Sequence, residues 1–412
     1  MYYYQYKGKY AFSLREYKEL EPVSELALAQ CTDTIFFLLE QQAEKFRRSF
    51  CLSDLSLIEI EKEDLRLLQK QPAASSLPTW AMEKLSEYKI KAINTAYPHW
   101  QEVFEEELPK KWRINLVGLG DVGSTLLIGL RLLGGDKISQ IGIYDIDALK
   151  VTRWEFETNQ IRYPDTDQLP PVITLTEDTL FDCDMFVFCV TVGIPALDSK
   201  GIDVRMAQLE GNGRIVSLYA KKAREAGFRG VFAVVSDPVD LLCKKALLES
   251  NINQEGQYDF MGLAPEQIRG YGLGVMHGRA AYYAAKSPEL QHYLQEGRAF
   301  GPHGQHLVIA DSITNYQQEY SLLLTEKARN ANLELREHGF KPYVAPALSS
   351  GAIAILETIS GHWHYSATYI GGVYMGARNR LLKSGTELEQ YKLPEQLLSR
   401  LCNSYKELEG IL

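Results

Sequence analysis

The stretch Arg113–Asp147 constrains the fold of this chain more than any other. It begins with a short apolar run, residues 114–117, that is typical of a buried parallel strand. Residues 124–133 have the pattern of a helix, and a second apolar run at residues 141–144 ends at Asp145. Three glycines lie between the first run and the helix in the spacing G-x-G-x-x-G, namely Gly118, Gly120 and Gly123. This order of strand, glycine turn, helix, strand and acid predicts a dinucleotide-binding βαβ unit.

Each part of this unit has a physical task in a dinucleotide site. Gly118 permits a tight turn, Gly120 lets the backbone approach a pyrophosphate, and Gly123 lets helix and strand pack closely. The N-terminus of the helix offers free N–H groups and a positive dipole end. Asp145 follows Gly118 by 27 residues, and a carboxylate there accepts hydrogen bonds from a ribose 2′-hydroxyl and repels a 2′-phosphate. The sequence therefore predicts NAD rather than NADP.

The alternation of strands and helices continues after the dinucleotide unit. In a doubly wound sheet, ligands bind at the carboxyl ends of the strands, so the loops after residues 190 and 235 are expected to line the site. We predict an α/β fold, with a Rossmann-type doubly wound parallel sheet over residues 113–273 and an α+β substrate domain over residues 274–412. The segments that support this prediction are expected strands at 185–190, 214–218 and 231–235, and expected helices at 151–161 and 205–209.

The first 112 residues are too long to be a simple arm. Apolar residues between Ile35 and Phe50 step by three and four positions, which favours a helix. Residues 80–95 and 100–108 also have helical patterns. We therefore predict a mainly helical N-terminal domain, residues 1–112, which serves either as a packing or oligomerisation unit or as a regulatory, partner-binding module.

Composition limits the partners of this 412-residue chain and its location. The net charge is −9 and there is no basic block, so nucleic acid and anionic membranes are poor partners. The sequence has neither a long uninterrupted apolar stretch nor the apolar core of a signal peptide, so we expect a cytoplasmic protein with no membrane span. The six cysteines are scattered and the histidines of residues 362–364 have no cluster of further ligands nearby, so no metal site is expected.

From about Arg113 to the C-terminus the chain resembles the lactate/malate dehydrogenase family. The resemblance rests on six ordered motifs: VGLGDVG with YDID, TVGIP, SDPVD, GYGLGVMHGRAAYY, FGPHGQ, and YVAPALSSGAIAILETI, which is nearer to the malate branch. It implies an NAD-dependent oxidoreductase that transfers hydride between nicotinamide and a 2-hydroxy or 2-oxo carboxylic acid, and by analogy a homo-oligomer. The cofactor-binding residues are then Gly118, Gly120, Asp121, Val122, Gly123, Asp145, Thr191 and Gly193.

The resemblance also implies three catalytic roles. His303, in the G-x-H-G turn, matches the histidine that exchanges a proton with the substrate. Arg279 matches the arginine that clamps the substrate carboxylate, for which a guanidinium fork is well shaped. Arg205, located by counting back from Asn212, matches the loop arginine that polarises the reacting carbonyl.

Two positions depart from the family pattern around the histidine. Met276 stands where the family has the aspartate that orients the histidine, and the neighbouring His277 is not a carboxylate either. Asp237 stands where the family has asparagine in its N-P-V-D segment. We hypothesise that the carboxylate has moved, so that Asp237 partners His303 directly or through His277. In the alternative, Asp237 only caps the helix that starts at Pro238.

The loop after TVGIP lacks the arginine that malate enzymes use for a second carboxylate. Ala196 stands there, and one alternative is that Lys200 substitutes for the arginine as a point charge. Otherwise Ala196 and Leu197 favour a larger or less charged side chain on the 2-oxo acid. Asp198 would instead select a cationic side chain. Two interpretations stay open: an NAD-dependent 2-hydroxy acid dehydrogenase, and a catalytically impaired NAD-binding sensor or partner-binding protein. Retention of His303 and both arginines favours the enzyme, whereas Met276 favours the alternative.

Overall fold

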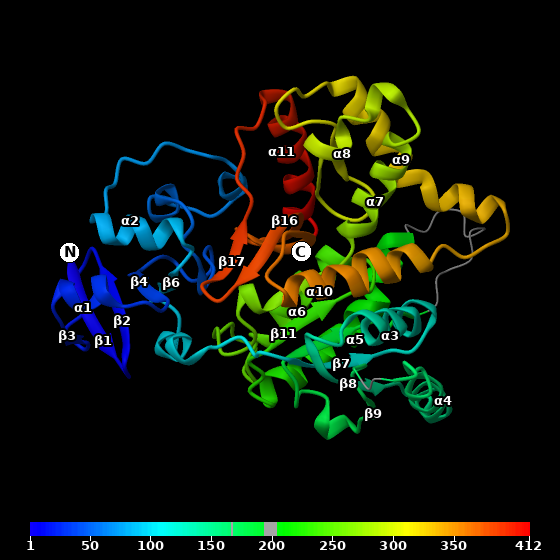
Figure 1. The fold of residues 1–412 in the computed structure, drawn as a ribbon, viewed down its shortest axis with the longest axis horizontal. Coiled ribbons are helices and arrows are strands. Elements are labelled where there is room, and N and C mark those ends of the chain that lie inside the picture. Colours follow the sequence, from blue (N-terminus) through cyan, green and yellow to red (C-terminus); the bar gives the residue numbers. More distant parts are fainter. Residues whose placement is uncertain (166–167, 193–203) are drawn as a thin grey trace.

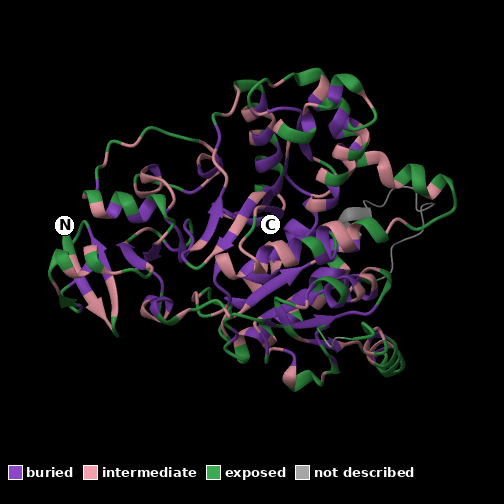
Figure 2. Ribbon diagram, in the orientation of Figure 1, coloured by how far each residue is buried: buried purple, intermediate pink, exposed green. Residues whose placement is uncertain are grey.

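The computed structural model describes residues 1–165, 168–192 and 204–412, and the side chains of residues 204–207 lie outside the description. The described residues build two large sheets and one two-stranded sheet. Residues 1–111 surround a smaller sheet on one side of the molecule, and the remaining residues surround a larger one (Figure 1). The strands of the larger sheet are mostly buried, whereas its covering helices alternate between buried and exposed surfaces (Figure 2). No helix of the described residues is long and apolar enough to cross a membrane.

The N-terminal unit is built mainly of strands, so the expectation of a mainly helical domain is wrong. Its six strands, within a fully described part of the chain, pair in the order β3-β1-β2-β4-β6-β5. They are β1 Tyr2–Tyr6, β2 Lys9–Ser13, β3 Glu21–Pro22, β4 Ile35–Leu39, β5 Ser49–Cys51 and β6 Ile90–Asn94. The helices are short: α1 Glu25–Gln30, η1 Leu55–Ile58, η2 Leu65–Leu68, α2 Thr79–Ser86 and η3 Trp100–Glu105.

The sequence signal failed here because β4 is buried on both faces. Ile35 and Phe37 belong to one core cluster, and Phe36 and Leu38 belong to another on the opposite face. The sequence of such a strand is a continuous apolar run, without the alternation of apolar and polar residues that marks a half-buried strand. The apolar residues after β4 added a coincidental helical spacing across what is in fact a loop leading to β5.

Nine strands of the described residues form the larger sheet, in the order β17-β16-β15-β12-β11-β10-β7-β8-β9. The six from β9 to β12 run parallel, and β15, β16 and β17 extend them antiparallel. The parallel strands are β7 Trp112–Val117, β8 Ile138–Tyr144, β9 Val172–Thr174, β10 Met185–Phe188, β11 Val231–Val234 and β12 Ile268–Gly270. The antiparallel strands are β15 His364–Ile370, β16 Val373–Leu382 and β17 Gly385–Leu388. The strand order changes direction between β7 and β10, where a doubly wound sheet opens a crevice for ligands.

Helices cover both faces of the larger sheet, and successive side chains of β10 show the two cores. Met185 and Val187 face α3 (Asp121–Leu133) and α10 (Ala354–Ile359), whereas Phe186 and Phe188 face α5 (Val204–Glu225) and α6 (Val239–Ser250). The other elements of this body are α4 Ala148–Asn159, α7 Leu273–Ala284, α8 Tyr293–Glu296, β13 Arg298–Phe300, β14 Val308–Ala310, α9 Gln318–Glu337, η7 Pro346–Ile353 and α11 Glu395–Glu409, with short turns η4 Glu177–Thr179, η5 Pro265–Gln267 and η6 Pro288–Leu290.

One strand expectation is wrong in this body. Residues 214–218 lie inside α5 and not in a strand. Val216, Ala220 and Ala223 contribute to one core cluster at helical spacing, so the apolar run belongs to the buried face of a helix. A short apolar run of this kind does not by itself separate a strand from a buried helix.

Candidate functional site

The glycine turn lies at the carboxyl end of β7, as the βαβ pattern predicts. Gly118 has φ +97°, a conformation that favours glycine, and the turn leads directly into α3. A Cβ on Gly123 would lie 1.9 Å from the Gly118 carbonyl oxygen, so the first turn of α3 packs on the end of the strand. A Cβ on Gly120 would meet nothing within 4 Å. The turn therefore presents open backbone at the N-terminus of a 13-residue helix.

Asp145 lies beside this turn, at the end of β8. Its Oδ2 accepts a hydrogen bond from the Leu119 N–H at 2.7 Å, and its Oδ1 accepts one from the Asp147 N–H at 3.0 Å. The next residue, Ile146, is 93% exposed, and Leu149 in α4 is also exposed. An acid that holds the glycine turn is thus followed by uncovered apolar side chains, which is an arrangement suited to a nucleoside.

The remaining expected cofactor residues in the described part of the chain lie near the carboxyl ends of β7 and β10. Asp121 and Val122 form the first turn of α3, and the Asp121 carboxylate is ion-paired with Lys341 at 3.2 Å. Thr191 follows β10 and accepts a hydrogen bond from the Asn212 amide at 3.4 Å. Gly193 lies outside the described residues.

His303 and Asp237 are in direct contact, although 66 residues separate them in sequence. His303 Nδ1 lies 3.0 Å from Asp237 Oδ1, with 20% of the histidine side chain and 48% of the aspartate side chain exposed. A carboxylate only accepts, so the imidazole donates its Nδ1 proton and leaves Nε2 with a lone pair. The N-cap of α6 is Pro238, which forms no side-chain cap bond, and Asp237 is the residue before it.

His303 is seated against the end of β12. A Cβ on Gly272 would lie 3.0 Å from His303 Cβ, so the lack of a side chain at Gly272 leaves room for His303. The turn that carries the histidine is fixed at Gly301, whose N–H donates to the Gly376 carbonyl oxygen of β16 at 2.9 Å. The carboxyl ends of β11 and β12 thus meet the His303 turn.

Arg279 lies on α7, close enough to Asp237 for the two charges to interact. Its Nη1 donates to the Met276 sulfur at 3.5 Å and to the Ala328 carbonyl oxygen at 3.3 Å. No carboxylate of the described residues lies within ion-pair distance of the Arg279 guanidinium. Burial lowers the pKa of Arg279, and the charges of Tyr283 and Asp237 partly oppose this effect. A half-buried cation beside the dyad is therefore able to bind an anionic group.

His277 does not join His303 to Asp237. Its Nδ1 lies 2.9 Å from the Tyr293 hydroxyl, and its ring stacks on Tyr365 at 4.6 Å. Burial, together with the positive charges of Arg298 and Arg378, lowers the pKa of His277 to about 4. His277 is therefore a neutral packing residue at ordinary pH.

Several expectations concern residues about which the structure says little or nothing. Arg205 falls within α5, but its side chain is outside the description. Residues 196–200, on which the substrate-specificity argument depends, lie outside the described residues.

The sequence predicted no role for Asn212, which served only to locate Arg205. It is completely buried in α5 and hydrogen-bonds to the segments after β10 and β11. The signal was present in the sequence, because Gly211-Asn212-Gly213 places three poor helix formers inside a helix of 22 residues.

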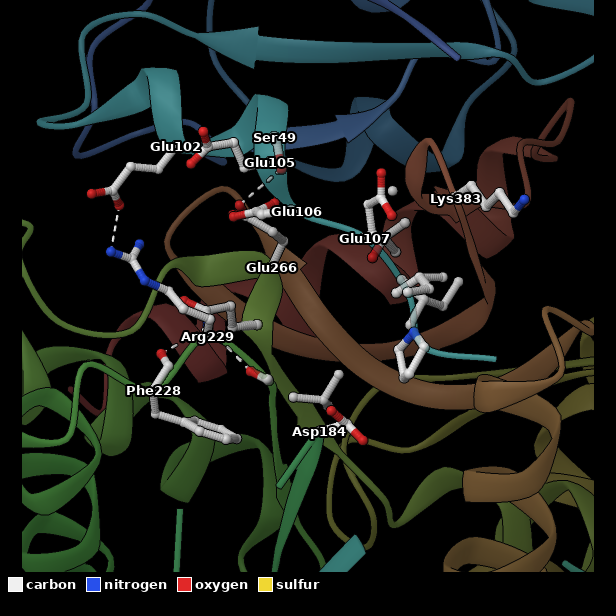
Figure 3. Close-up of a pocket in the computed structure, with 18 of the residues that line it drawn as sticks. Ser49, Glu102, Glu105, Glu106, Glu107, Asp184, Phe228, Arg229, Glu266 and Lys383 are labelled. Atoms are coloured by element: carbon white, nitrogen blue, oxygen red, sulfur yellow. Dashed lines mark hydrogen bonds and ion pairs between the residues drawn. The ribbon is translucent and has the colours of Figure 1, made fainter. Parts of the chain in front are cut away.

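A cavity lies at the opposite edge of the sheet, between the two units. Its volume is about 590 Å³, and it meets the amino ends of β7, β10, β11 and β12. Figure 3 shows Glu102, Glu105 and Glu106 on the N-terminal side, with Arg229 facing Glu102 from the other side. Glu106 is ion-paired with Arg48 and Lys91. This cavity holds none of the expected catalytic or cofactor residues.

Metal ligands are absent from the described residues, in which no cluster of three or more histidine, cysteine or acidic side chains is close enough to hold an ion. His364 is buried and hydrogen-bonds to Thr358 and Ser366. The six cysteines are all free thiols.

Comparisons with known proteins agree with this architecture. No protein-family model matches the chain. The chain is 26% identical over 214 residues to the L-lactate dehydrogenase of Mesomycoplasma hyopneumoniae, which covers 51% of this chain and 61% of that enzyme. It is 26% identical over 200 residues to the L-lactate dehydrogenase of Mycoplasma pneumoniae, covering 47% of this chain and 57% of that enzyme. The matches thus span less than two thirds of these relatives.

Solved structures share the fold of the larger unit. A lactate dehydrogenase from a deep-sea metagenome library superposes with a TM-score of 0.58 at 19% identity, covering 73% of this chain and 97% of that chain. The malate dehydrogenase of Archaeoglobus fulgidus, solved in complex with NADH, superposes with a TM-score of 0.57 at 18% identity, covering 72% and 97%. The chain is therefore a distant homologue of L-lactate dehydrogenases, with an α/β fold that is shared by lactate and malate dehydrogenases.

Proposed function

We propose that the chain is an NAD-dependent oxidoreductase that interconverts a 2-hydroxy and a 2-oxo carboxylic acid. The observation that supports this most is the 3.0 Å contact between His303 Nδ1 and Asp237 Oδ1, at the edge of the sheet where the glycine turn also lies. The carboxylate missing at Met276 has a counterpart at Asp237, so the histidine has an acidic partner. The distant homology to L-lactate dehydrogenases supports the same class of reaction.

The residues of the Rossmann-type unit fit NAD. Gly120 leaves open space beside the N-terminus of α3 for a diphosphate, and the Asp145 carboxylate lies beside the glycine turn, where it would accept hydrogen bonds from a ribose. Exposed Ile146 and Leu149 offer apolar surface for an adenine ring. Val122 and Thr191 would complete the contacts from α3 and from the end of β10. When bound, the nicotinamide supplies hydride for reduction of the 2-oxo acid or accepts it from the 2-hydroxy acid.

His303 acts as the acid and base of the proposed reaction. With its Nδ1 proton donated to Asp237, its Nε2 accepts the hydroxyl proton of a 2-hydroxy acid as the bond from C2 to hydrogen breaks. In the reverse direction, the protonated ring returns that proton to the carbonyl oxygen. Asp237 holds the ring in the tautomer that this step needs and stabilises the imidazolium that forms. Arg205, from the start of α5, is proposed to polarise the reacting carbonyl.

Arg279 is the proposed anchor for the carboxylate of the substrate. It is half-buried, near Asp237, and without a carboxylate at ion-pair distance in the part of the chain that the structure describes. A bidentate pair with an incoming carboxylate would satisfy its donors and fix the substrate. Because Ala196 replaces the second arginine of malate enzymes, we propose a monocarboxylic 2-oxo acid rather than a C4 dicarboxylate, with Asp198 able to favour a cationic side chain.

The test is oxidation of NADH with a panel of aliphatic, aromatic, acidic and basic 2-oxo acids. The reaction is monitored by the loss of NADH absorbance. The proposal expects turnover on at least one acid and its loss in His303→Asn, with NADH affinity unchanged. Arg279→Gln is expected to raise KM for the 2-oxo acid by about 100-fold, because a charge-assisted bidentate pair is lost. Turnover that survives in His303→Asn would remove the histidine from the mechanism.

A sensor role is the second candidate, since Met276 is buried where related enzymes have the orienting aspartate. It expects NADH binding, by fluorescence titration, with no turnover on any member of the panel. The two candidates thus give opposite results in one assay.

A further inference from the structure

Asn212 links the two chain segments that follow β10 and β11. Its Oδ1 accepts a hydrogen bond from the Val192 N–H at 2.8 Å, and its Nδ2 donates to the Asp237 carbonyl oxygen at 2.6 Å. The same amide also donates to Thr191 Oγ1 at 3.4 Å. One buried side chain therefore connects a segment of the expected cofactor site to the residue that faces His303.

The place of Asn212 is set by close packing of α5. A Cβ on the preceding residue, Gly211, would lie 2.4 Å from Val192 Cγ2, so the helix is too close to accept a side chain there. The ladder between β10 and β11 ends at Phe188 and Val234, before Asp237 is reached. Asn212 thus joins the two segments at a point where the sheet itself no longer does.

The Asp237 side chain is short, so the position of its main chain limits where the carboxylate can lie. Nearly half of its side chain is exposed, so packing around the carboxylate constrains it only in part. We propose that Asn212 is a positioning residue, which holds the Asp237 main chain so that the carboxylate meets His303 Nδ1. The consequence for turnover rests on the proposed function, but the contact is testable without any turnover.

The first test is the rate at which diethyl pyrocarbonate modifies His303 in the full-length protein, measured by mass spectrometry of the peptide. A carboxylate that accepts the Nδ1 proton makes Nε2 a better nucleophile. Asp237→Asn is therefore expected to slow the modification by about threefold to tenfold, and Asn212→Ala to slow it similarly. A rate in Asn212→Ala at or above that of the wild type, with Asp237→Asn slowed, overturns the proposal.

Asn251→Ala is the matched control. Asn251 is also buried, and its amide donates to the Leu247 and Leu263 carbonyl oxygens, but it ends α6 and does not contact Asp237. It is expected to lower the melting temperature as Asn212→Ala does and to leave the His303 rate unchanged. An equal slowing in both asparagine variants would mean a general structural effect and would also overturn the proposal. If Asn212→Ala does not fold, Asn212→Ser supplies a smaller cavity with a hydroxyl that is too short to reach both segments.

Turnover supplies the second readout. On an accepted 2-oxo acid, Asn212→Ala is expected to lower kcat by about 10-fold to 100-fold, with KM and the NADH dissociation constant changed by less than about twofold. An increase in KM at constant kcat contradicts a role in orienting the dyad. Absence of turnover in the wild type would count against the proposed function alone, because the His303 modification rates would still decide the role of Asn212.

Discussion

The two edges of the larger sheet carry charged groups in contrasting states. At the amino edge, Glu266 is ion-paired with Arg48, and Glu102 with Arg229, so the cavity between the two units is lined by charges that neutralise each other. At the carboxyl edge, Arg279 has no described carboxylate at ion-pair distance, and the His303–Asp237 pair is open to solvent. The cavity therefore joins two units, whereas the residues proposed for substrate binding lie where the parallel strands end.

This contrast separates the charges that hold the two units together from those proposed to take part in chemistry. The Arg48–Glu266 pair at the amino edge is buried, with only 8% of the Arg48 side chain and 11% of the Glu266 side chain exposed. Buried charges of this kind need each other and are not available to a ligand. The following predictions test whether the two edges differ as stated, beginning with the largest expected effect.

Asp237→Asn should have the largest effect on turnover. Loss of the carboxylate that orients a catalytic histidine costs on the order of 10⁴ in rate in serine proteases, and we expect a decrease in kcat of about 10³-fold to 10⁴-fold here. The measurement is kcat on the best 2-oxo acid. Glu102→Gln, which removes a carboxylate at the amino edge, is the control and should leave kcat unchanged. Full turnover in Asp237→Asn would refute the idea of a relocated carboxylate.

Glu266→Gln should lower stability and leave turnover unchanged. Its carboxylate accepts hydrogen bonds from the Arg48 N–H and Nε and from the Ser49 hydroxyl, so the variant leaves a buried guanidinium partly uncompensated. We expect the free energy of unfolding to fall by about 3 kcal/mol, as measured by urea denaturation, with kcat unchanged. Glu105→Gln, at the exposed pair with Lys7, should cost less than about 1 kcal/mol. An equal loss of unfolding free energy in the two variants would show that burial of the Arg48–Glu266 pair does not increase its contribution to stability.

The buried histidine of α7 predicts a pH effect on stability. The pKa of His277 is lowered to about 4 by burial and by Arg298 and Arg378, whereas the unfolded chain protonates this residue near its ordinary value. As pH falls from about 6.5 to about 4, the unfolded state therefore binds a proton that the folded state does not, and stability falls by up to about 1.4 kcal/mol per pH unit.

The measurement is the pH dependence of the free energy of unfolding in the wild type and in His277→Gln. The variant should have a shallower slope over this window and an unchanged pH profile of turnover. A slope equal to that of the wild type would show that the pKa of His277 is the same in the folded and unfolded states. A changed pH profile of turnover would indicate that His277 takes part in the reaction.

Lys341→Met should have the smallest effect. Lys341 is ion-paired with Asp121 in the first turn of α3, where a diphosphate is expected, so its loss should weaken NADH binding by about twofold to fivefold at low salt. Fluorescence titration measures the affinity, and Lys383→Met at the amino-edge cavity is the control. Wild-type affinity in a double variant with Asp121→Asn would mean that Lys341 only neutralises Asp121 and does not attract the cofactor itself.

Local patterns predicted the fold well where they were unambiguous. The glycine spacing, the apolar run before it and the acid after it placed β7, α3 and β8 correctly, because each signal is set by neighbours in sequence. The same reasoning failed at β4 and at residues 214–218, because a strand buried on both faces and the buried side of a helix both appear as apolar runs. Which partner covers such a run depends on elements that lie far away in the chain.

By itself, the sequence determined the βαβ unit with its glycine turn, the distant family resemblance and the residues Met276 and Asp237 that depart from the family pattern around His303. Only the tertiary structure decided that Asp237 meets His303, that His277 is turned away against Tyr365, and that Asn212 supports the segment carrying Asp237. The reason is physical: backbone conformation responds to adjacent residues, whereas a contact across 66 residues depends on the packing of α5, β11 and β12 together.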